Sequence, residues 1–473
     1  MKVYTALALL MAVISLTADA APTSKQSIFK VDLKKNDLPE YFTWLQKSLI
    51  EKNRAILKYS DNIRLAYDHG LVGQEAIVKL DAATTPVFGK GKHGKGSNGS
   101  KNGGKNNNNP DNGQPDNSGN PDNGQPDNSN NPNNGQPDNS GNQPDNSGKG
   151  IVNNPLKDQG MDIGYHGPVQ IGGQTFDVIF DTGSADLWIP AQACNDAACK
   201  AHKSFDPKKS KGFTTDNKPF QIRYGTGEVS GVIAKDDISI AGAVAKGQTF
   251  GLSTKMSQDF QDTEFDGILG MGLDQLSSQK AKTPFSDLVT QNAVKDSVFG
   301  FFLGRQKDGS NSQLTLGGID SSKFTGQLKY NKLVSNVGYW EIALDDASVN
   351  GKPLGFNKKT AIIDTGTTLL IAPPADADAI HKEIKGAVSQ QGEYFVPCNT
   401  DAVVALTFGG VTYKISPKDL AREPTKQNNM CLSGIAGGNI GGADQWLVGD
   451  TFLKNVYSAY DIKKLAVGFA PVK

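Results

Sequence analysis

Two segments of the sequence place an aspartate at the end of an aliphatic run. "DVIFDTGSADLWIP" contains Asp181, and "AIIDTGTTLL" contains Asp364. Burying an isolated carboxylate is costly, because the loss of water disfavours its charged form unless partners compensate. Two such acids facing each other cannot both ionise, so one carboxyl keeps its proton. One acid and one base can then activate a shared water molecule and protonate a leaving group.

The residues after each acid suit a supporting role. Glycine lets backbone approach an acid closely, and a hydroxyl can hold a carboxylate oxygen. The residues expected to support the acids are Thr182, Gly183, Ser184, Thr365, Gly366 and Thr367. A single D-T-G triplet would most simply be a surface turn. Two copies in matched apolar surroundings favour a facing pair of acids instead.

The sequence around the two acids also repeats. Each acid follows a predicted hairpin, which turns at Gly172–Gly173 in one copy and at Asn350–Gly351 in the other. Each acid is followed by two aliphatic residues and a glycine, Ile268–Leu269–Gly270 and Leu447–Val448–Gly449. The repeat predicts two lobes with the same internal plan, each contributing one acid from the end of a buried strand.

From Ile151 onwards, short alternating apolar runs are separated by clusters of Gly, Asn and Asp. This pattern is typical of many short antiparallel strands with tight turns. Helical patterns are few, and the best are 284–294 and 376–388. We therefore predict an all-β bilobal fold with minor helices, in which pseudo-symmetric β lobes 151–335 and 336–473 flank a central cleft. Nothing reads as a βαβ unit, which argues against the aspartate motifs of phosphatases and ATPases.

Residues 1–20 have the composition of a secretory signal peptide. Lys2 leads into an apolar stretch that ends at the A-x-A site Ala18–Ala20. A membrane anchor is the alternative, but the apolar stretch is too short for one and no stop-transfer pattern follows. We expect a secreted, extracellular protein that does not act at a membrane.

Residues 21–90 form a small basic block with 11 basic and 8 acidic residues. Its apolar residues near helical spacing are Leu45, Leu49, Ala55, Ile56 and Tyr59. With no evident core of its own behind a signal peptide, this block is predicted to be a propeptide. A small independent domain is the alternative.

Residues 91–150 repeat a Pro-Asp-Asn-Gly/Ser unit and contain almost no apolar side chain. Such a segment cannot offset the entropy of ordering, so it is predicted to be a disordered spacer. Over the whole chain, Lys plus Arg and Asp plus Glu are both 49, which gives no argument for nucleic-acid binding. The 4 cysteines show no metal-ligand spacing, and we expect neither a metal nor a cofactor.

From "FDTGSADLWIP" and "FDGILGMG" to "AIIDTGTTLL" and "LVGDTFLKNVYSAYD", residues 151–473 resemble the pepsin-like aspartic proteases. The secreted acid proteases of moulds, the rhizopuspepsin-like enzymes, are the most similar group. The resemblance implies a monomeric acid endopeptidase made as a zymogen, with Asp181 and Asp364 as catalytic acids. It also implies polypeptide substrates and inhibition by pepstatin-type peptides.

By the same resemblance, Tyr224 in "YGTGEVSG" is the tyrosine of the flap, the hairpin that closes over bound peptide, and Gly225 and Thr226 follow it. Trp188 resembles the residue whose indole N–H holds the Tyr224 hydroxyl. Some mould enzymes carry an acid where Thr226 stands, and it helps them accept lysine before the cut. Its absence implies a preference for bulky apolar side chains.

The resemblance extends to residues outside the flap. Phe260 and Ile268 are expected as pocket walls, and Lys58 with Tyr59 in "ILKYS" resembles a Lys-Tyr pair that plugs the acids in related zymogens. For Lys58, an exposed helix charge is the alternative.

The four cysteines allow three pairings. Nearest-neighbour pairing joins Cys194 to Cys199 and Cys398 to Cys431, one bond in each lobe, whereas crossed pairings would bridge the lobes. Two other functions stay open. One is a catalytically inactive relative that binds peptides, and the other is a cell-wall protein built around the Asn/Pro/Asp-rich block.

Overall fold

The computed structural model divides the chain into two units, 1–47 and 48–473, and all residues that it describes belong to the second. The described residues are 52–53, 55–56, 58–59 and 150–473 without 161, 163, 225–226, 310, 391 and 426–428. The predicted signal peptide lies outside these residues, as does the predicted spacer up to residue 149. The boundaries predicted for the three N-terminal segments and the two lobes stay predictions.

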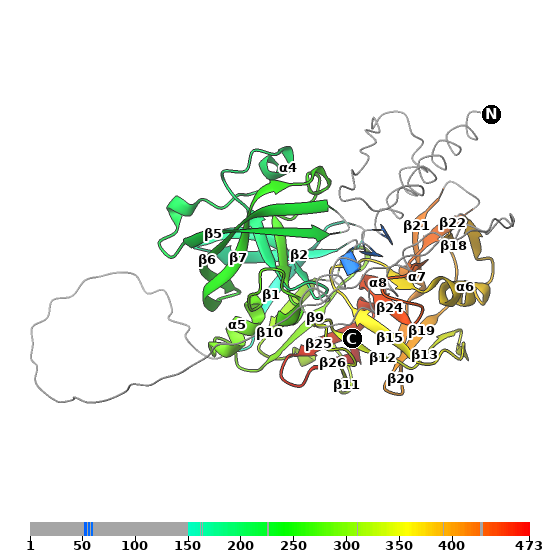
Figure 1. Ribbon diagram of the computed structural model, residues 1–473. Helices are drawn as coiled ribbons and strands as arrows, with labels where there is room; N and C mark the ends of the chain where they lie inside the picture. Colours follow the sequence, from blue (N-terminus) through cyan, green and yellow to red (C-terminus); the bar gives the residue numbers. More distant parts are fainter. Residues whose placement is uncertain are drawn as a thin grey trace, which may run out of the picture. The chain divides into compact units, whose positions relative to one another are not determined.

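The prediction of a mostly β fold with two lobes and few helices is confirmed (Figure 1). The largest sheet, from edge to edge, consists of β11 (Lys329–Lys332), β26 (Ala466–Pro471), β25 (Val456–Asp461), β9 (Val298–Phe302), β10 (Ser312–Leu316), β1 (Val152–Asp158), β2 (Tyr165–Ile171), β3 (Gln174–Asp181), β8 (Gly267–Gly270), β4 (Leu187–Pro190), β7 (Ala243–Met256), β6 (Gly227–Ile240) and β5 (Thr214–Tyr224).

Three smaller sheets are formed by residues after 340. The first consists of β12 (Glu341–Leu344), β15 (Lys359–Ile363), β24 (Gln445–Val448), β16 (Leu370–Ala372) and β23 (Ile435–Gly437). The second consists of β14 (Lys352–Pro353), β13 (Asp346–Val349), β19 (Val404–Phe408) and β20 (Val411–Ile415). The third consists of β17 (Val388–Gln390), β18 (Glu393–Pro397), β22 (Met430–Ser433) and β21 (Ala421–Pro424). The α-helices between residues 150 and 473 are α4 (Ala197–Lys200), α5 (Pro284–Thr290), α6 (Pro374–Lys382), α7 (Pro417–Leu420) and α8 (Asp450–Leu453). Both predicted helices, at 284–294 and 376–388, therefore exist as α5 and α6, each ending earlier than its pattern.

Both predicted hairpin turns are present, and both use the left-handed backbone region. Gly172 and Gly173, between β2 and β3, have φ of 54° and 76°, and Asn350 and Gly351, between β13 and β14, have φ of 52° and 80°. Two-residue hairpin turns of this kind require positive φ at both central positions, which glycine and asparagine adopt most readily. The first turn sets the register of the β2–β3 hairpin that ends at Asp181, whereas Asp364 follows β15, which pairs with β12 and β24.

Most strands pair antiparallel, as the sequence pattern predicted, but the strands that end at the acids also have parallel neighbours. Strand β3 pairs in parallel with β8, so that Asp181 lies opposite Gly270, and β15 pairs in parallel with β24, so that Ile363 lies opposite Val448. Each aliphatic-aliphatic-glycine segment that follows an acid in the sequence is therefore a strand beside it. A parallel neighbour must come from a distant part of the chain, so local alternation alone did not predict it.

The largest sheet crosses the predicted division between 335 and 336. Strand β25, near the C-terminus, pairs with β9 along Ser458↔Phe301 to Asp461↔Val298. Figure 1 shows β9 and β25 between the green strands β5–β7 and the orange strands β18–β22. An aromatic cluster lies over this junction, where Tyr460 stacks on Phe299 with ring centroids 4.9 Å apart and meets Trp340 edge-on at 5.3 Å. The two lobes thus share one sheet and part of one core.

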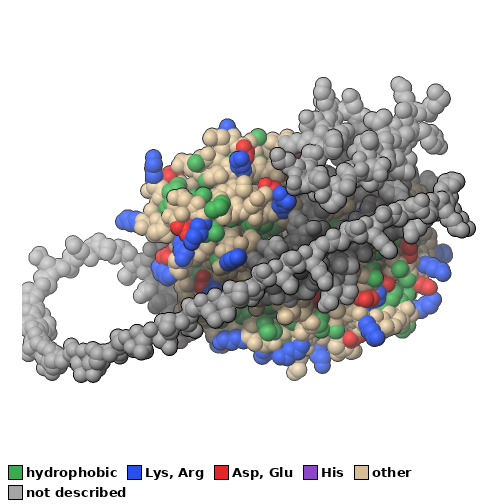
Figure 2. Space-filling model, in the orientation of Figure 1, with side chains coloured by type: hydrophobic (Ala, Val, Ile, Leu, Met, Phe, Trp, Pro, Cys, Tyr) green, Lys and Arg blue, Asp and Glu red, His purple; other side chains and the backbone are tan. Residues whose placement is uncertain are grey.

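Two disulfides are formed, Cys194–Cys199 and Cys398–Cys431, which are the nearest-neighbour pairs. The first closes a loop beside α4, and the second ties the end of β18 to β22. In the described residues, no helix is both long and apolar enough to cross a membrane. On the face in Figure 2, lysine and arginine side chains are scattered among acidic ones and form no continuous basic patch among the described residues.

One buried polar cluster of α6 bears on stability at acidic pH. His381 is buried, its Nδ1 lies 2.8 Å from the Ala377 carbonyl oxygen, and its Nε2 lies 2.8 Å from Ser433 Oγ. A carbonyl can only accept, so Nδ1 carries the proton and Nε2 accepts from the Ser433 hydroxyl. The ring also stacks on Tyr394, with centroids 4.1 Å apart. Burial lowers the pKa of His381 to about 4.

We expect His381→Gln to flatten the loss of stability in acid. Because the folded pKa lies below the usual 6.5, the unfolded chain binds more protons between pH 6.5 and 4, and stability is lost as the pH falls through that range. Removing the imidazole should shrink the difference in unfolding free energy between pH 6.5 and 4 by roughly 2–3 kcal/mol. Urea unfolding of the chain with and without His381→Gln, each in an Asp181→Asn background, measures this. Parallel pH profiles would contradict the assignment.

Candidate active site

The two predicted acids end the matched strands and lie together in the interior. Asp181 is the last residue of β3, Asp364 directly follows β15, and their exposed fractions are 3% and 0%. Each carboxylate accepts bonds from its own loop. Gly183 N–H donates to Asp181 Oδ1 at 2.9 Å, and the Ser184 hydroxyl donates to Oδ2 at 2.5 Å.

The second loop repeats this arrangement. Gly366 N–H donates to Asp364 Oδ1 at 2.8 Å, and the Thr367 hydroxyl donates to Oδ2 at 2.6 Å. Hydrogen bonds to the charged form favour ionisation, so these donors offset part of the desolvation of each carboxylate. The hydroxyls at the fourth position of each D-T-G-S/T segment thus lie where the sequence pattern predicted them.

The two loops are tied to each other by their threonines. Thr182 N–H donates to Thr365 Oγ1 at 3.1 Å, and Thr365 N–H donates to Thr182 Oγ1 at 3.0 Å. Each hydroxyl in turn donates to a carbonyl of the opposite strand, Thr182 to Ile363 at 2.8 Å and Thr365 to Phe180 at 2.6 Å. All four contacts are buried, so the loops have no solvent to exchange them with, and the two acids are held at a fixed separation.

The glycines leave room for the facing acid. A Cβ added at Gly366 would overlap Asp181 Oδ1, and one added at Gly183 would lie 2.5 Å from both Asp364 Cγ and the Tyr59 hydroxyl. No real Cβ tolerates such distances, so only glycine permits this approach. The close contact between each loop and the opposite acid therefore explains the residue type at both positions.

A lysine from the N-terminal block lies between the acids. Lys58 Nζ donates to Asp181 Oδ1 at 2.8 Å, to Asp181 Oδ2 at 3.0 Å and to Asp364 Oδ2 at 3.0 Å. The hydroxyl of Tyr59 donates to Asp364 Oδ2 at 2.9 Å. Lys58 is 7% exposed, which rules out the alternative of an exposed helix charge in this structure. The described residues around it, 52–53, 55–56 and 58–59, are helical.

These contacts give the two acids different pKa values. Burial raises the pKa of Asp181 to about 6, while Lys58 opposes this shift and Asp364 adds to it. Burial acts in the same direction on Asp364, but Lys58 and the hydrogen bonds that this carboxylate accepts lower its pKa to about 2. Burial alone would lower the pKa of Lys58, yet the two carboxylates outweigh it and raise the pKa. The site therefore favours an ammonium beside at least one carboxylate.

The candidate flap residues gather in one apolar cluster beside Asp181. Trp188 Nε1–H donates to the Tyr224 hydroxyl at 2.9 Å. Phe260 meets Trp188 edge-on at 5.3 Å between ring centroids, and Ile268 lies opposite Trp188 where β4 pairs with β8. The remaining two predicted flap residues, Gly225 and Thr226, lie outside the described residues.

The sequence of this chain is similar to the sequences of known proteins. The family described as "Eukaryotic aspartyl protease" matches residues 164–472, which is more than half of the chain. The chain belongs to this pepsin-like family. Both loops with their acids, the cluster around Trp188 and the strands β8 and β24 fall inside the matched region, so the resemblance stated from the sequence is confirmed.

Named relatives of this aspartyl protease chain include fungal and mammalian proteins. The chain is 41% identical over 321 residues to "Probable aspartic-type endopeptidase CTSD" of Arthroderma benhamiae, covering 67% of this chain and 63% of that protein. It is 40% identical over 329 residues to "Aspartic protease" of Phaffia rhodozyma, covering 67% and 78%. It is 39% identical over 337 residues to "Cathepsin E" of Rattus norvegicus, covering 69% and 84%. The match thus spans less than two thirds of the length of the Arthroderma relative.

Two further features of this aspartyl protease site were not assigned from the sequence. Tyr339, in the segment "GYWEI", meets Tyr59 with ring centroids 5.0 Å apart, in an apolar cluster with Ile362 and Leu447. In the sequence, the position of Tyr339 next to Trp340 indicates the end of a buried strand but does not indicate a contact with a distant helix. The second feature is an acid, Glu393, whose carboxylate pairs with Lys52. No sequence signal connects two residues 341 positions apart.

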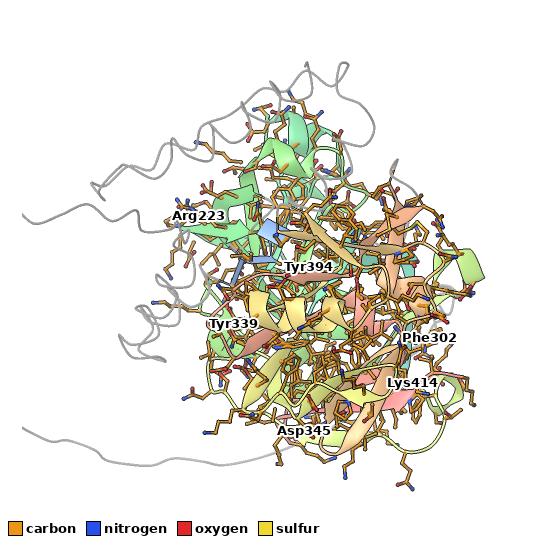
Figure 3. The ribbon with its side chains drawn as sticks, turned by 90° about the vertical axis from the view of Figure 1, so that its right-hand side faces the viewer. Arg223, Phe302, Tyr339, Asp345, Tyr394 and Lys414 are labelled. Atoms are coloured by element: carbon orange, nitrogen blue, oxygen red, sulfur yellow. A yellow bond between two sulfur atoms is a disulfide. The ribbon has the colours of Figure 1, made fainter. Side chains whose placement is uncertain are left out.

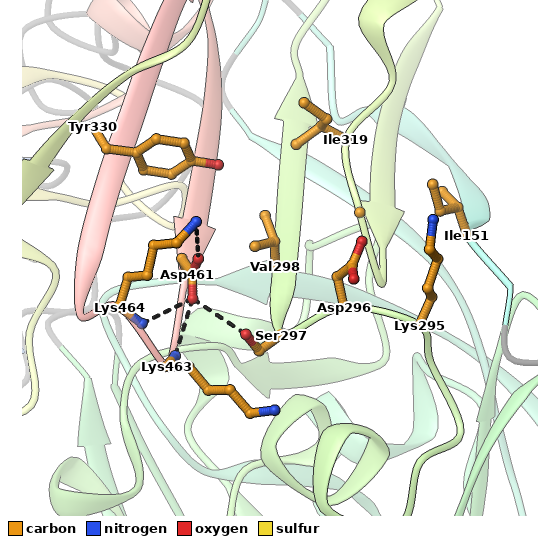
Figure 4. A pocket seen from close by; sticks show the side chains of 11 residues that line it. Ile151, Lys295, Asp296, Ser297, Val298, Ile319, Tyr330, Asp461, Lys463 and Lys464 are labelled. Carbon is orange, nitrogen blue, oxygen red and sulfur yellow. Dashed lines mark hydrogen bonds and ion pairs between the residues drawn. The ribbon is translucent and has the colours of Figure 1, made fainter.

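A pocket with a volume of about 650 Å³ lies elsewhere, on the sheet formed by β9, β25 and β11 (Figure 4). None of the candidate site residues lines it. Its central acid, Asp461, accepts from the Ser297 hydroxyl at 3.2 Å and from the N–H groups of Lys463 and Lys464 at 3.1 and 2.9 Å. Those bonds cap the turn between β25 and β26, which is a structural role. The paired loops, and not this pocket, therefore remain the candidate active site.

We expect Thr182→Val to destabilise the aspartyl protease fold by about 2 kcal/mol or more, because it leaves the buried Thr365 N–H and the Ile363 carbonyl without their partner. Thermal or urea unfolding in an Asp181→Asn background measures the loss. Thr175→Val, at an exposed position of β3, is the matched control and should change stability by at most about 0.5 kcal/mol. Equal effects of the two substitutions would show that the cross-loop bonds do not hold the loops together.

Proposed function

We propose that this chain is an acid endopeptidase in which Asp181 and Asp364 activate a water molecule that attacks an internal peptide bond. The observation that supports this most directly is the pair of buried acids held face to face by the reciprocal Thr182–Thr365 bonds. The names of the relatives, aspartic-type endopeptidase and aspartic protease, agree with it.

In the proposed reaction, the pair holds one proton because two adjacent carboxylates cannot both ionise without a cation between them. The ionised carboxylate takes a proton from the water molecule as the water oxygen attacks the carbonyl carbon of the peptide bond. The protonated carboxyl group stabilises the developing oxyanion. A proton then passes to the amide nitrogen, the C–N bond breaks, and the pair again holds one proton. Thr182, Gly183, Ser184 and their counterparts Thr365, Gly366 and Thr367 keep the two carboxyls in place.

The apolar cluster around Trp188 supports a preference for bulky hydrophobic residues beside the cut. Phe260 and Ile268 supply apolar walls, and Tyr224 on the edge of β5 is held by the indole of Trp188. Gly225 and Thr226 complete the proposed flap. No cluster of His, Cys, Asp and Glu that could hold a metal ion is found among the described residues, and the proposed reaction uses only groups of this chain.

We expect Asp181→Asn and Asp364→Asn each to lower the cleavage of an acid-denatured protein at pH 3–4 by at least about 10²–10⁴-fold, because the water needs both an acid and a base. Activity of the wild type should fade towards neutral pH as the shared proton leaves. Pepstatin-type peptides should inhibit, and chelators should not. Cleavage is followed as acid-soluble fragments, with circular dichroism to verify that each variant is folded.

The control for the loss of charge is Asp216→Asn, since Asp216 forms an exposed ion pair with Lys218 far along the sequence from both acids. It should cleave like the wild type. Near wild-type cleavage by either dyad variant would contradict the mechanism. A wild-type protein that binds a pepstatin-type peptide but cleaves nothing would instead be the inactive peptide-binding relative.

The protein is further proposed to be secreted as a zymogen, with a signal peptide in 1–20, a propeptide in 21–90 and a spacer in 91–150. Support comes from Lys58, whose ammonium occupies the space between Asp181 and Asp364 where the attacking water would sit. Tyr59 adds a bond to Asp364 and packs on Tyr339. Removal of this helix, followed by cleavage in the spacer or near Lys149–Gly150, would free the acids.

Acid is the proposed trigger. The pKa of Asp364 is lowered from 3.8 to about 2, against the effect of burial, by Lys58 and by the hydrogen bonds it accepts. A carboxylate whose pKa is depressed by a partner stabilises the paired state above its ordinary pKa, and this stabilisation is lost as the pH falls through the depressed value. The contact with Lys58 should therefore hold the helix above about pH 4 and weaken progressively towards pH 2.

We expect purified Lys58→Ala precursor to convert faster, and at higher pH, than the wild type, because the helix no longer carries the cation that pairs with both acids. Conversion is followed by gel electrophoresis over pH 2–6, and sequencing of the new N-terminus locates the cut. Asn53→Ala changes an exposed residue of the same helix and should convert like the wild type. Identical curves for Lys58→Ala and the wild type would remove Lys58 from the lock.

A further inference from the structure

The two walls expected for the apolar pocket, Phe260 and Ile268, belong to different elements. Phe260 ends a short 3₁₀ turn, and Ile268 lies in β8. Both side chains are buried in one apolar cluster with Trp188 and Tyr224. Tyr224 is the last residue of β5, at the end of the strand that the label of Arg223 marks in Figure 3. The spacing of the two walls therefore depends on contacts between separate segments of the chain.

A histidine donates a hydrogen bond to the backbone of one wall. His202 Nε2 lies 2.7 Å from the Phe260 carbonyl oxygen, and because a carbonyl can only accept, Nε2 carries a proton. The same oxygen accepts from the Thr263 hydroxyl at 2.9 Å and from the Thr263 N–H at 3.3 Å, but Thr263 belongs to the same turn and moves with it. Among the described residues, His202 is thus the donor that ties this carbonyl to another segment.

The second ring nitrogen of His202 faces the other wall. Nδ1 lies 4.0 Å from Asp266 Oδ1, within the range of an ion pair when the ring is protonated, and the imidazole side chain is only 4% exposed. Asp266 directly precedes β8 and stands two residues before Ile268. Its Oδ2 accepts from the Asp177 N–H of β3 at 2.9 Å, so the carboxylate holds the start of β8 against β3. The imidazole therefore lies between the Phe260 carbonyl and the carboxylate that fixes the strand of Ile268.

The segment that carries His202 is anchored on both sides. On one side, the His202 N–H donates to the Cys199 carbonyl at 3.3 Å, and Cys199 is joined to Cys194 and buried in the apolar cluster of the pocket. On the other side, the Lys203 N–H donates to Asp266 Oδ1 at 2.9 Å. Neither anchor belongs to the turn whose carbonyl the ring binds, so the ring can act as a spacer for that turn.

We propose that His202 is a positioning residue that holds Phe260 and Ile268 at a fixed separation and thereby sets the size of the apolar side chain preferred beside the cut. The proposal rests on the proposed endopeptidase function and on the pocket walls expected there. The Phe260 ring meets Trp188 edge-on at 5.3 Å and Tyr224 edge-on at 6.3 Å between centroids, so a shift of its turn would change the space beside both rings. In a hydrophobic pocket one methylene is worth about 10- to 200-fold in kcat/KM, so a small displacement of a wall should change selectivity measurably.

The experiment uses the mature enzyme and peptides with one cut site, in which the residue directly before or directly after the cut is phenylalanine or alanine. The wild type should prefer phenylalanine at one of these two positions. In His202→Leu, which removes both ring nitrogens, we expect the ratio of the two kcat/KM values to fall roughly fivefold to tenfold, because the wall at Phe260 is no longer held. The kcat for the alanine peptide should stay near the wild-type value, since neither acid is changed.

His202→Gln tests the hydrogen bond itself. The amide nitrogen of glutamine lies the same number of bonds from Cβ as Nε2 of histidine, so it can still donate to the Phe260 carbonyl. This variant should keep the ratio within about twofold of the wild type. Lys200→Gln is the matched control, because Lys200 is an exposed residue of α4 two positions before His202. It should keep the wild-type ratio.

The comparison is a ratio within each enzyme, so a general loss of activity or of folded protein cancels. An unchanged ratio in His202→Leu, or an equal fall in His202→Gln, would overturn the role of His202. A wild type that cleaves both peptides without preference at either position would overturn it as well. Failure of the wild type to cleave any peptide would instead overturn the proposed function.

Discussion

The reciprocal bonds between Thr182 and Thr365 are the constraint on which the rest of the site depends. Two carboxylates repel each other and prefer water, so a fold that holds Asp181 and Asp364 together in its interior needs a framework stronger than that repulsion. The four buried threonine bonds supply it, since each backbone N–H and each hydroxyl is paired across the two loops. The parallel pairs β3·β8 and β15·β24 fix the strands from which the loops emerge.

The threonine bonds hold the two acids in place, but other groups must compensate the charge of the carboxylates. Within each loop, a glycine N–H and a hydroxyl stabilise one carboxylate, and the arrangement is nearly identical in both copies. The pKa values nevertheless separate, with that of Asp181 raised by burial and that of Asp364 lowered by Lys58 and its hydrogen bonds against the effect of burial. A symmetric framework therefore holds an asymmetric pair while Lys58 lies beside it.

Local sequence predicted those parts of the fold that local chemistry determines. The glycines and asparagine at the hairpin turns, the D-T-G-S/T loops and the two short helices α5 and α6 follow from residue type and spacing. Parallel pairing next to the acids, the strands β25 and β26 that join the largest sheet, and the stacking of Tyr339 on Tyr59 depend on contacts between distant segments. The Lys58 contact was accessible only through family resemblance, because an isolated lysine on a helix has no distinguishing pattern. The contact between Lys52 and Glu393 was not indicated by the family resemblance either.

The face of the 52–59 helix can be regarded as a complement to the surface that it covers. A cation lies against the two acids, an aromatic ring lies on Tyr339, an aliphatic side chain lies on Gly438, and a second cation lies on Glu393. In the proposed zymogen, the contact at the acids is sufficient for inhibition, because it alone occupies the proposed place of the water. The other contacts of this helix bury apolar surface against Tyr339 and Gly438, and so help to hold the ammonium against the acids.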